Sequence, residues 1–404
     1  MPDSMGMNIT HHIQTSLILG SVLVASASPV WAEEQGVGSV ELVEFPFEGI
    51  AFTDIDFSDD GQTIVCISRF ADSNTVYLYE DELWKPVYAG AGSQLFPTFV
   101  AGISDDGGTI LLTDIEDSFL YREGVFSKLT DSWIATDRRT TQTTLVQGAA
   151  VSGDGSTVAL IGDDRRLEYD DVRSFLWNGE SRLEEISIGD PDVEDFGYRV
   201  EAVSQDGSAF LLNTQGRREK QVNNVRINGR QLSFLWEEGS ITQLPEPDVG
   251  YDVSMDARAM SLNQAVVVGN GYIDSRHVDQ VREYGDYGSW ERESFGWLWD
   301  RATGVTQDLT SDRFESGYFS DVSGDGSIAL GAGVQFDGSV DGFLWVRDQG
   351  IVMLDQLFDV LKIDLHADSY TLQSISNDGR RLYGIAYIED QIFALTVTIP
   401  DLAP

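Results

Sequence analysis

The 404-residue sequence is poor in cysteine, lysine and histidine, and each shortage excludes a class of structure or function. Its one cysteine, Cys66, allows neither a disulfide within the chain nor a cysteine-based zinc site. Lys and Arg number 26 against 67 Asp and Glu, a formal net charge of −41. This charge repels nucleic acid and anionic membranes, so we expect no nucleic-acid partner. The short signatures of serine hydrolases, zinc peptidases and phosphate-binding loops are also missing, and no cofactor is predicted.

The N-terminal region has the pattern of a secretion signal. An apolar, small-residue stretch covers residues 15–30, and VWA at residues 30–32 fits a signal-peptidase cleavage site. We expect residues 1–32 to be a signal peptide and residues 33–404 to form one domain, secreted or periplasmic and not inserted in a membrane after cleavage. The segment before the stretch carries no Lys or Arg, so an uncleaved anchor remains an alternative.

A short motif, Ser-x-Asp-Gly, recurs along the chain. Its aspartates are Asp60, Asp106, Asp154, Asp206, Asp325 and Asp378. Alternating residues precede each motif and a compact apolar run follows it, which is typical of a β-hairpin. Glycine takes a positive φ without steric cost, and Asp or Ser caps such a turn through its side chain. We therefore expect these aspartates to be structural turn caps rather than metal ligands or catalytic groups.

The motif belongs to a longer repeat of four strands. After each hairpin come an aromatic-Leu-aromatic segment, such as FLW at residues 175–177, and a short fourth strand. Successive motif glycines are 46, 48, 52, 119 and 53 residues apart, and the interval of 119 holds two units. The second of these has ARAMSLNQAVVVG (residues 257–269) where the Asp-Gly turn is expected.

Seven four-stranded units of about 50 residues are typical of a β-propeller. The last unit supplies three strands, and residues 39–45 form an extra strand near the N-terminus. We predict an all-β fold, a seven-bladed β-propeller of four-stranded blades whose last blade is closed by the N-terminal strand. An open solenoid is the alternative, but it has no need of a spare strand at one end.

The units resemble the HAF repeat, a motif of proteins predicted to be extracellular. The resemblance rests on AAVSGDGSTVALIG at residues 149–162, followed by SFLW at residues 174–177. They are also similar to the WD40-like repeats of TolB-type periplasmic propellers, in which Ser-Pro-Asp-Gly holds the same place; this chain lacks the proline. The resemblance covers nearly the whole mature chain and implies an exported β-propeller, but no shared catalytic set.

Long insertions interrupt the repeat on one face of the predicted ring. In a four-stranded blade the Asp-Gly hairpins share one face, and the loops between second and third strands lie on the other. The longest loops, residues 213–230 and 271–293, are rich in Arg, which binds carboxylate, sulfate and phosphate and stacks on rings. We predict a ligand surface composed of Arg217, Arg218, Arg226, Arg276, Arg282, Tyr284 and Trp290. Ion pairs with nearby Asp and Glu are the structural alternative.

These features predict an exported, non-catalytic binding or scaffold propeller whose ligand is an acidic glycan or a protein partner. The alternative is an exported polysaccharide lyase, in which Arg neutralises a uronate carboxylate and His277 or Tyr284 takes the α-proton. We predict no metal site. The carboxylates of GDPDVED at residues 189–195 leave calcium open, although their spacing fits no EF-hand loop.

Overall fold

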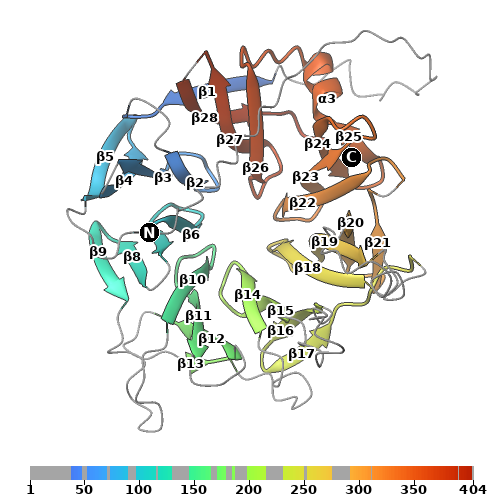
Figure 1. Cartoon of the computed structure of the whole chain (residues 1–404), viewed down its shortest axis with the longest axis horizontal. Coiled ribbons are helices and arrows are strands. Elements are labelled where there is room, and N and C mark those ends of the chain that lie inside the picture. The colour runs from blue at the N-terminus through green and yellow to red at the C-terminus, as the bar shows by residue number, and fades with distance from the viewer. Residues whose placement is uncertain are drawn as a thin grey trace, which may run out of the picture.

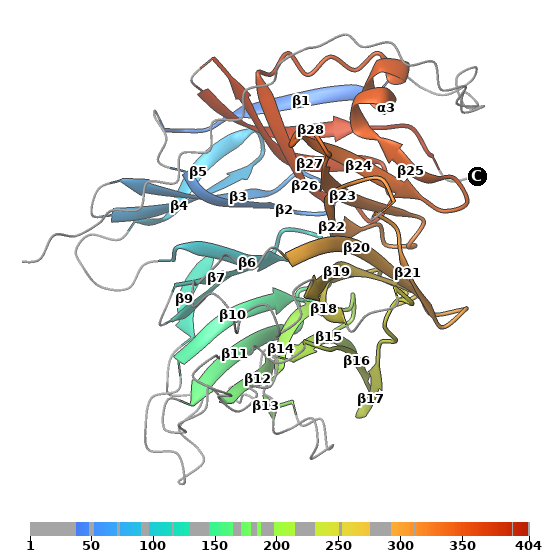
Figure 2. The same ribbon diagram turned by 45° about the vertical axis from the view of Figure 1, so that its right-hand side comes forward.

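A computed structural model describes residues 38–47, 52–70, 73–89, 97–114, 117–129, 145–164, 171–178, 184–186, 198–214, 231–249, 253–274, 292–310, 312–389 and 391–402. These residues form seven four-stranded antiparallel sheets arranged in a ring (Figures 1 and 2), and one edge strand of each sheet lines a central channel. The predicted seven-bladed β-propeller is therefore confirmed. We number the blades 1 to 7 from the one that begins with β2 to the one that begins with β26.

Each blade runs from a strand at the channel to a strand at the outside of the ring (Figure 1). The innermost strands are β2 (Phe52–Phe57), β6 (Phe99–Ile103), β10 (Leu145–Val151), β14 (Tyr198–Val203), β18 (Val253–Met260), β22 (Ser316–Val322) and β26 (Ser369–Ile375). The second strands are β3 (Ile64–Phe70), β7 (Thr109–Thr113), β11 (Val158–Asp164), β15 (Ala209–Thr214), β19 (Val266–Asp274), β23 (Ile328–Val334) and β27 (Arg381–Ile388). The third strands are β4 (Ser73–Glu80), β8 (Ser118–Arg122), β12 (Asp171–Trp177), β16 (Ser233–Glu237), β20 (Arg292–Asp300), β24 (Val340–Val346) and β28 (Gln391–Thr398). The outermost strands are β5 (Leu83–Ala89), β9 (Val125–Leu129), β13 (Glu184–Glu185), β17 (Ser240–Gln243), β21 (Val305–Asp308), β25 (Gly350–Met353) and, in blade 7, β1 (Ser39–Glu44).

The N-terminal strand closes the ring as predicted. β1 pairs antiparallel with β28 over its whole length, from Ser39 opposite Thr398 to Glu44 opposite Phe393. The order β1-β28-β27-β26 makes blade 7 from one N-terminal and three C-terminal strands. Because β1 lies at the outside of the sheet, it covers an edge of β28 that would otherwise be open to another strand.

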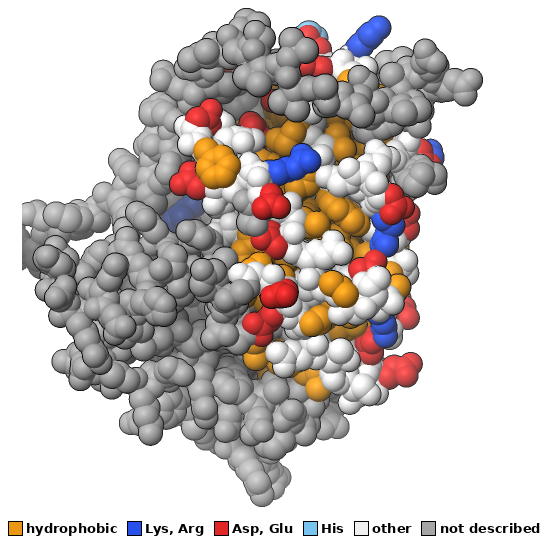
Figure 3. All heavy atoms as spheres, turned by 90° about the vertical axis from the view of Figure 1, so that its right-hand side faces the viewer, with side chains coloured by type: hydrophobic (Ala, Val, Ile, Leu, Met, Phe, Trp, Pro, Cys, Tyr) orange, Lys and Arg blue, Asp and Glu red, His pale blue; other side chains and the backbone are white. Residues whose placement is uncertain are grey.

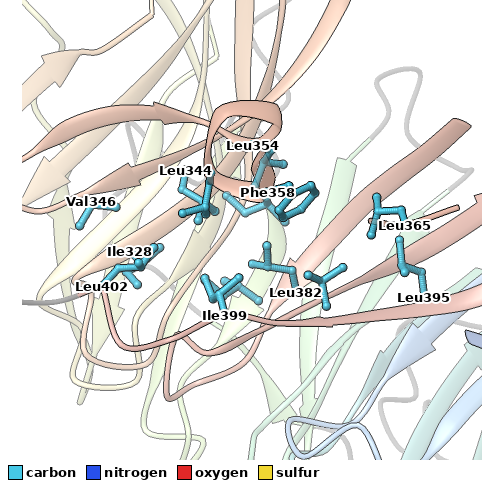
Figure 4. Packing of buried hydrophobic residues seen from close by; sticks show 14 of the residues in the cluster. Ile328, Leu344, Val346, Leu354, Phe358, Leu365, Leu382, Leu395, Ile399 and Leu402 are labelled. Atoms are coloured by element: carbon cyan, nitrogen blue, oxygen red, sulfur yellow. The ribbon is translucent and has the colours of Figure 1, made fainter. Parts of the chain in front are cut away.

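Blades 6 and 7 share a hydrophobic cluster that also holds the end of the described chain. The helix α3 (Leu354–Leu361) follows β25 and turns Leu354, Leu357 and Phe358 into this cluster. The segment after β28 adds Ile399 and Leu402, which lie across the cluster from the helix (Figure 4). This packing fixes the C-terminal segment next to the blade that β1 closes.

The Ser-x-Asp-Gly motifs are turns with one repeated hydrogen-bond pattern. At Ser104 the hydroxyl donates to Asp106 Oδ1 (2.7 Å), and its oxygen accepts from the amide of Thr109 (2.9 Å). Asp106 Oδ1 also accepts from the amide of Gly108 (2.8 Å), and Gly107 has a φ of +71°. All six predicted aspartates accept a backbone amide two residues later, which is the hydrogen bond predicted for turn caps.

Blade 5 keeps this turn without its usual residues. Ser261 donates to Asn263 Oδ1 (2.8 Å), which also accepts from the amide of Ala265 (2.9 Å). Gln264 stands where the other blades have glycine and still has a left-handed φ of 57°. The amide oxygen of Asn therefore replaces the carboxylate, and the geometry is conserved where the sequence motif is not.

A bulge interrupts every innermost strand near the channel. In blades 2 to 7 the pairing skips the residue three positions before the turn serine: Ala101, Ala149, Glu201, Arg258, Ser320 and Gln373. In blade 1 the skipped residue is Thr53, five positions before Ser58. A bulge bends its strand and re-aims the side chains around it, which is what shapes the channel wall.

Candidate functional site

The predicted ligand surface lies outside the described residues. Arg217, Arg218 and Arg226 fall in residues 215–230, and Arg276, Arg282, Tyr284 and Trp290 fall in residues 275–291, together with His277. The acidic segment 189–195 is outside them as well. The flanking strands are described: one segment joins β15 to β16 in blade 4, and the other joins β19 to β20 in blade 5. Both segments therefore leave the face opposite to the Ser-x-Asp-Gly turns, which we call the loop face.

The base of the blade 4 segment is tied firmly to blade 5. Asn213 lies at the end of β15, and its Oδ1 accepts from Ser233 Oγ (2.7 Å) and from the amide of Ala257 (3.0 Å). Its Nδ2 donates to Asp256 Oδ1 (2.8 Å) and to the carbonyl of Ala257 (3.0 Å). A buried amide with all its donors and acceptors engaged fixes its neighbours in place. The two long segments thus start from adjoining, well-anchored blades.

The described residues contain a second candidate site, a cavity of about 310 Å³ in the central channel. Bulged residues and their successors line it together, for example Glu201 with Ala202 and Arg258 with Ala259. The wall from blades 2 and 3 is small and apolar, with Ala101, Gly102, Ile103, Ala150 and Val151. The volume is at the lower end of the range for small-molecule pockets, about 300–1,000 Å³.

Blades 4 and 5 contribute two arginines and two acids that neutralise one another. Arg199 pairs with Glu201 on β14, and Arg258 Nη2 lies 2.5 Å from Asp256 Oδ2 on β18. Burial raises the pKa of Glu201 and of Asp256, and in each case both arginines act in the opposite direction. This wall therefore contributes polar groups but no net charge to the cavity.

Side chains from several blades bridge the channel at the end of the turns. The backbone amide of Asn377 donates to Asp59 Oδ1, and the side-chain Nδ2 of Asn377 donates to Asp105 Oδ2 (2.8 Å). These two hydrogen bonds join blade 7 to blades 1 and 2. Gln205 of blade 4 hydrogen-bonds Asp105 as well. A side chain at Gly153 would meet Gln205 Oε1 at 2.1 Å, so the backbone passes close to this bridge. These contacts narrow the turn end of the channel, and Asp59, Asp105 and Asn377 line the cavity there.

Two carboxyls of blades 1 and 6 face the cavity from the same strand position. Asp56 and Asp321 each lie two residues before the turn serine, and both line the cavity. Burial raises the pKa of Asp56 to about 7, although the hydrogen bond from the amide of Phe57 acts to lower it. Burial also raises the pKa of Asp321 to about 7, against the amides of Ile375 and Val322. Both groups therefore exchange protons near neutral pH.

Sequence reasoning missed these two aspartates. When the repeats are aligned on the turn serine, blades 2 to 5 have Gly or Ala two residues before it, whereas blades 1 and 6 have Asp. This difference is the sequence signal that could have identified them. Among the described residues, no three His, Cys, Asp or Glu side chains are arranged to hold a metal ion. No helix in the described ranges is long and apolar enough to span a membrane.

Comparison with known proteins gives likeness of fold alone. No protein-family model matches the chain, and no curated protein is similar to it in sequence. The resemblance to HAF repeats is therefore not confirmed and remains a resemblance of motifs.

Solved propellers resemble the chain at low identity. An oligogalacturonate lyase from Vibrio parahaemolyticus is 11% identical over 92% of this chain and 99% of its own, with a TM-score of 0.54. The propeller domain of the Trilobed protease from Pyrococcus furiosus is 12% identical over 87% of this chain and 96% of its own, with a TM-score of 0.52. An open Velcro topology is described for that domain, whereas β1 closes blade 7 here. A TolB protein from Agrobacterium tumefaciens, 13% identical over 67% of this chain and 84% of its own, has a TM-score of 0.40, too distant to carry an argument.

Proposed function

We propose that this chain is an exported, non-catalytic binding propeller that holds an acidic glycan on its loop face. The observation that carries the proposal is the difference between the two faces. The turn face repeats one hydrogen-bonded hairpin seven times, whereas the two longest segments leave the loop face from adjoining blades. Variable loops on a rigid scaffold are the usual place for binding.

The charge distribution supports an anionic ligand for the Arg-rich segments. At a net charge of −41, an anionic glycan meets long-range repulsion, so only a local group of cations admits it. Several described arginines are engaged in ion pairs: Arg301 with Glu237, Arg347 with Asp300, and Arg380 with Asp401. Figure 3 shows that most Lys and Arg visible on one side of the molecule lie beside acidic side chains. We assign the binding role to Arg217, Arg218, Arg226, Arg276 and Arg282, with Tyr284 and Trp290 stacking on sugar rings.

A lyase activity remains the second candidate, and it depends on His277 and Tyr284. The fold is shared with an oligogalacturonate lyase, but at 11% identity this likeness does not transfer that activity. A propeller that only binds leaves its glycan intact, whereas a lyase releases unsaturated uronate products.

A glycan panel tests the proposal. We expect the wild-type chain to bind uronate-containing or sulfated polymers and not neutral dextran, and the variant Arg217→Ala/Arg218→Ala/Arg276→Ala/Arg282→Ala to bind at least about tenfold more weakly. Lysine at the same four positions is the matched control, because it keeps the charge but loses the forked hydrogen bonds. No binding by the wild-type chain, or equal binding by both proteins, would overturn the proposal. Ultraviolet absorbance from unsaturated products, lost in His277→Ala, would establish the lyase instead.

A further inference from the structure

The central cavity carries carboxyl groups that form no ion pair with any described residue. Asp56, Asp321, Asp59 and Asp105 all line it. In the described part of the chain, Arg258 and Arg199 are engaged with Asp256 and Glu201, and no ion pair reaches any of the four lining aspartates. These aspartates are half-buried, and a carboxylate that is partly removed from water without a counter-charge is costly, so it takes up a proton or binds a cation.

Asp56 has an acceptor that is still available. Asp56 is half-buried, and it lines the cavity. Its Oδ1 accepts from the amide of Phe57 (2.9 Å), whereas no described residue donates to Oδ2. Each oxygen of Asp321 accepts one amide, from Val322 (2.8 Å) and Ile375 (2.9 Å), although a carboxylate oxygen can accept two.

The blade between these two carboxyls carries a serine at the corresponding position. Blade 7 lies between blades 6 and 1, and at the same position, two residues before its turn serine, it carries Ser374. Asp321, Ser374 and Asp56 thus follow one another around the ring, and all three line the cavity. An ammonium group has three donors and no acceptor, which matches two carboxylates and a hydroxyl.

We propose that the central cavity binds an organic cation, a primary ammonium group carried on a short aliphatic chain. The ammonium lies against Asp56, Ser374 and Asp321, and the hydrocarbon lies against the apolar wall of Ala101, Ala150 and Val151. The cavity volume of about 310 Å³ equals roughly ten waters at about 30 Å³ each, so it has room for a lysine side chain or a short diamine together with several waters. The site is distinct from the loop-face surface and goes beyond the proposed glycan binding.

Binding depends on pH because both carboxyls must be ionised. Their titration near neutral pH makes the ligand bind more tightly above pH about 7. The charged and titratable groups facing them from neighbouring elements are Asp54, Asp59, Asp105, Arg199, Glu201, Asp256, Arg258, Arg381 and Tyr383.

Titration calorimetry with putrescine at about pH 8 tests this site. We expect one molecule bound per chain, no binding of the uncharged isostere butanediol, and binding at least about tenfold weaker in Asp56→Asn and Asp321→Asn. Asp337→Asn removes an equal charge from an exposed turn outside the cavity lining, so it should bind as the wild type does. At about pH 5.5 the wild-type affinity should fall toward that of the Asn variants.

Two sources of the ammonium are distinguished by a second probe. If a blocked lysine peptide binds and its norleucine counterpart does not, the ammonium group of the ligand belongs to a protein side chain. If putrescine binds and the lysine peptide does not, the ligand is a free amine. The proposal is overturned if neither probe binds the wild-type chain, or if putrescine binds at several sites and equally in the Asn variants, which is non-specific attraction to an acidic protein. The four-arginine variant should bind putrescine normally, so failure of glycan binding leaves this test intact.

Discussion

At the scale of single residues, one carboxylate oxygen organises each turn. Asp106 Oδ1 accepts from Ser104 Oγ and from the amide of Gly108, and these hydrogen bonds lower the pKa of Asp106. We expect Asp106→Ala to lower the free energy of unfolding by about 1 kcal/mol, as for other side-chain caps. Asp106→Asn should cost much less, because Asn263 makes the same bonds in blade 5. Urea unfolding of the three proteins measures this. A loss of ligand binding with unchanged stability would give these turns a functional role.

The two cavity aspartates, whose pKa values are raised, should make the folded chain less stable as the pH rises. Asp56 has a pKa of about 7 in the folded chain, above the value of 3.8 for an unperturbed carboxyl, so the folded state binds more protons between these values. Its contribution to stability is complete below pH about 4 and is lost as pH rises through about 7. We expect Asp56→Asn to raise the free energy of unfolding by at least about 1 kcal/mol at pH 8 and to change it little at pH 4. Unfolding curves at both pH values measure this, and an equal effect at both would show that Asp56 is ionised throughout.

At the scale of elements, β1 is the strand whose loss the ring should tolerate least. Its removal leaves the edge of β28 unpaired over six residues and takes away Val40 and Leu42, which pack against the cluster of blades 6 and 7. We expect a chain lacking residues 39–44 to aggregate or to unfold at a lower temperature. A synthetic peptide of residues 38–45 added in trans should restore the midpoint. A shortened chain that stays monomeric and equally stable would show that β1 is not needed for closure.

The elements themselves could be predicted because each carries a local signal. Ser-x-Asp-Gly marks a turn through side chains two to five residues apart, and FLW at residues 175–177 marks the third strand β12. The two-residue β13 in blade 3 follows the same order. The bulges could not be predicted, because Glu201 is skipped only in its pairing with β15, a contact that no local pattern encodes.

The cavity could not be predicted either, because residues far apart in the sequence form its wall. Asp56 and Asp321 are 265 positions apart in the sequence, and closure of the ring between blades 7 and 1 brings them to one wall. Arg258 was not recognised as a channel residue, because the bulge at blade 5 decides that it lines the channel. The Arg-rich segments at residues 215–230 and 275–291 remain a prediction from sequence.

At the scale of the whole molecule, the net charge sets the response to salt. A charge of −41 means that every part of the ring repels the rest, whereas described pairs such as Arg301–Glu237 and Arg347–Asp300 are local attractions on the surface. Exposed pairs of this kind contribute about 0.2–1 kcal/mol each, and salt screens them together with the repulsion. Because the repulsion sums over the whole chain and the ion pairs among the described residues are few, screening removes more repulsion than attraction.

We therefore expect the thermal midpoint to rise by a few degrees between about 0.01 M and 0.1 M NaCl, as the Debye length falls from about 30 Å to about 10 Å. Differential scanning calorimetry at constant pH measures this rise. Arg301→Gln is the matched control: it removes the inter-blade pair with Glu237, so it should lower the midpoint slightly at every salt concentration and leave the rise with salt almost unchanged. A midpoint that falls with salt in the wild-type chain, and not in Arg301→Gln, would mean that the inter-blade pairs outweigh the self-repulsion of the ring.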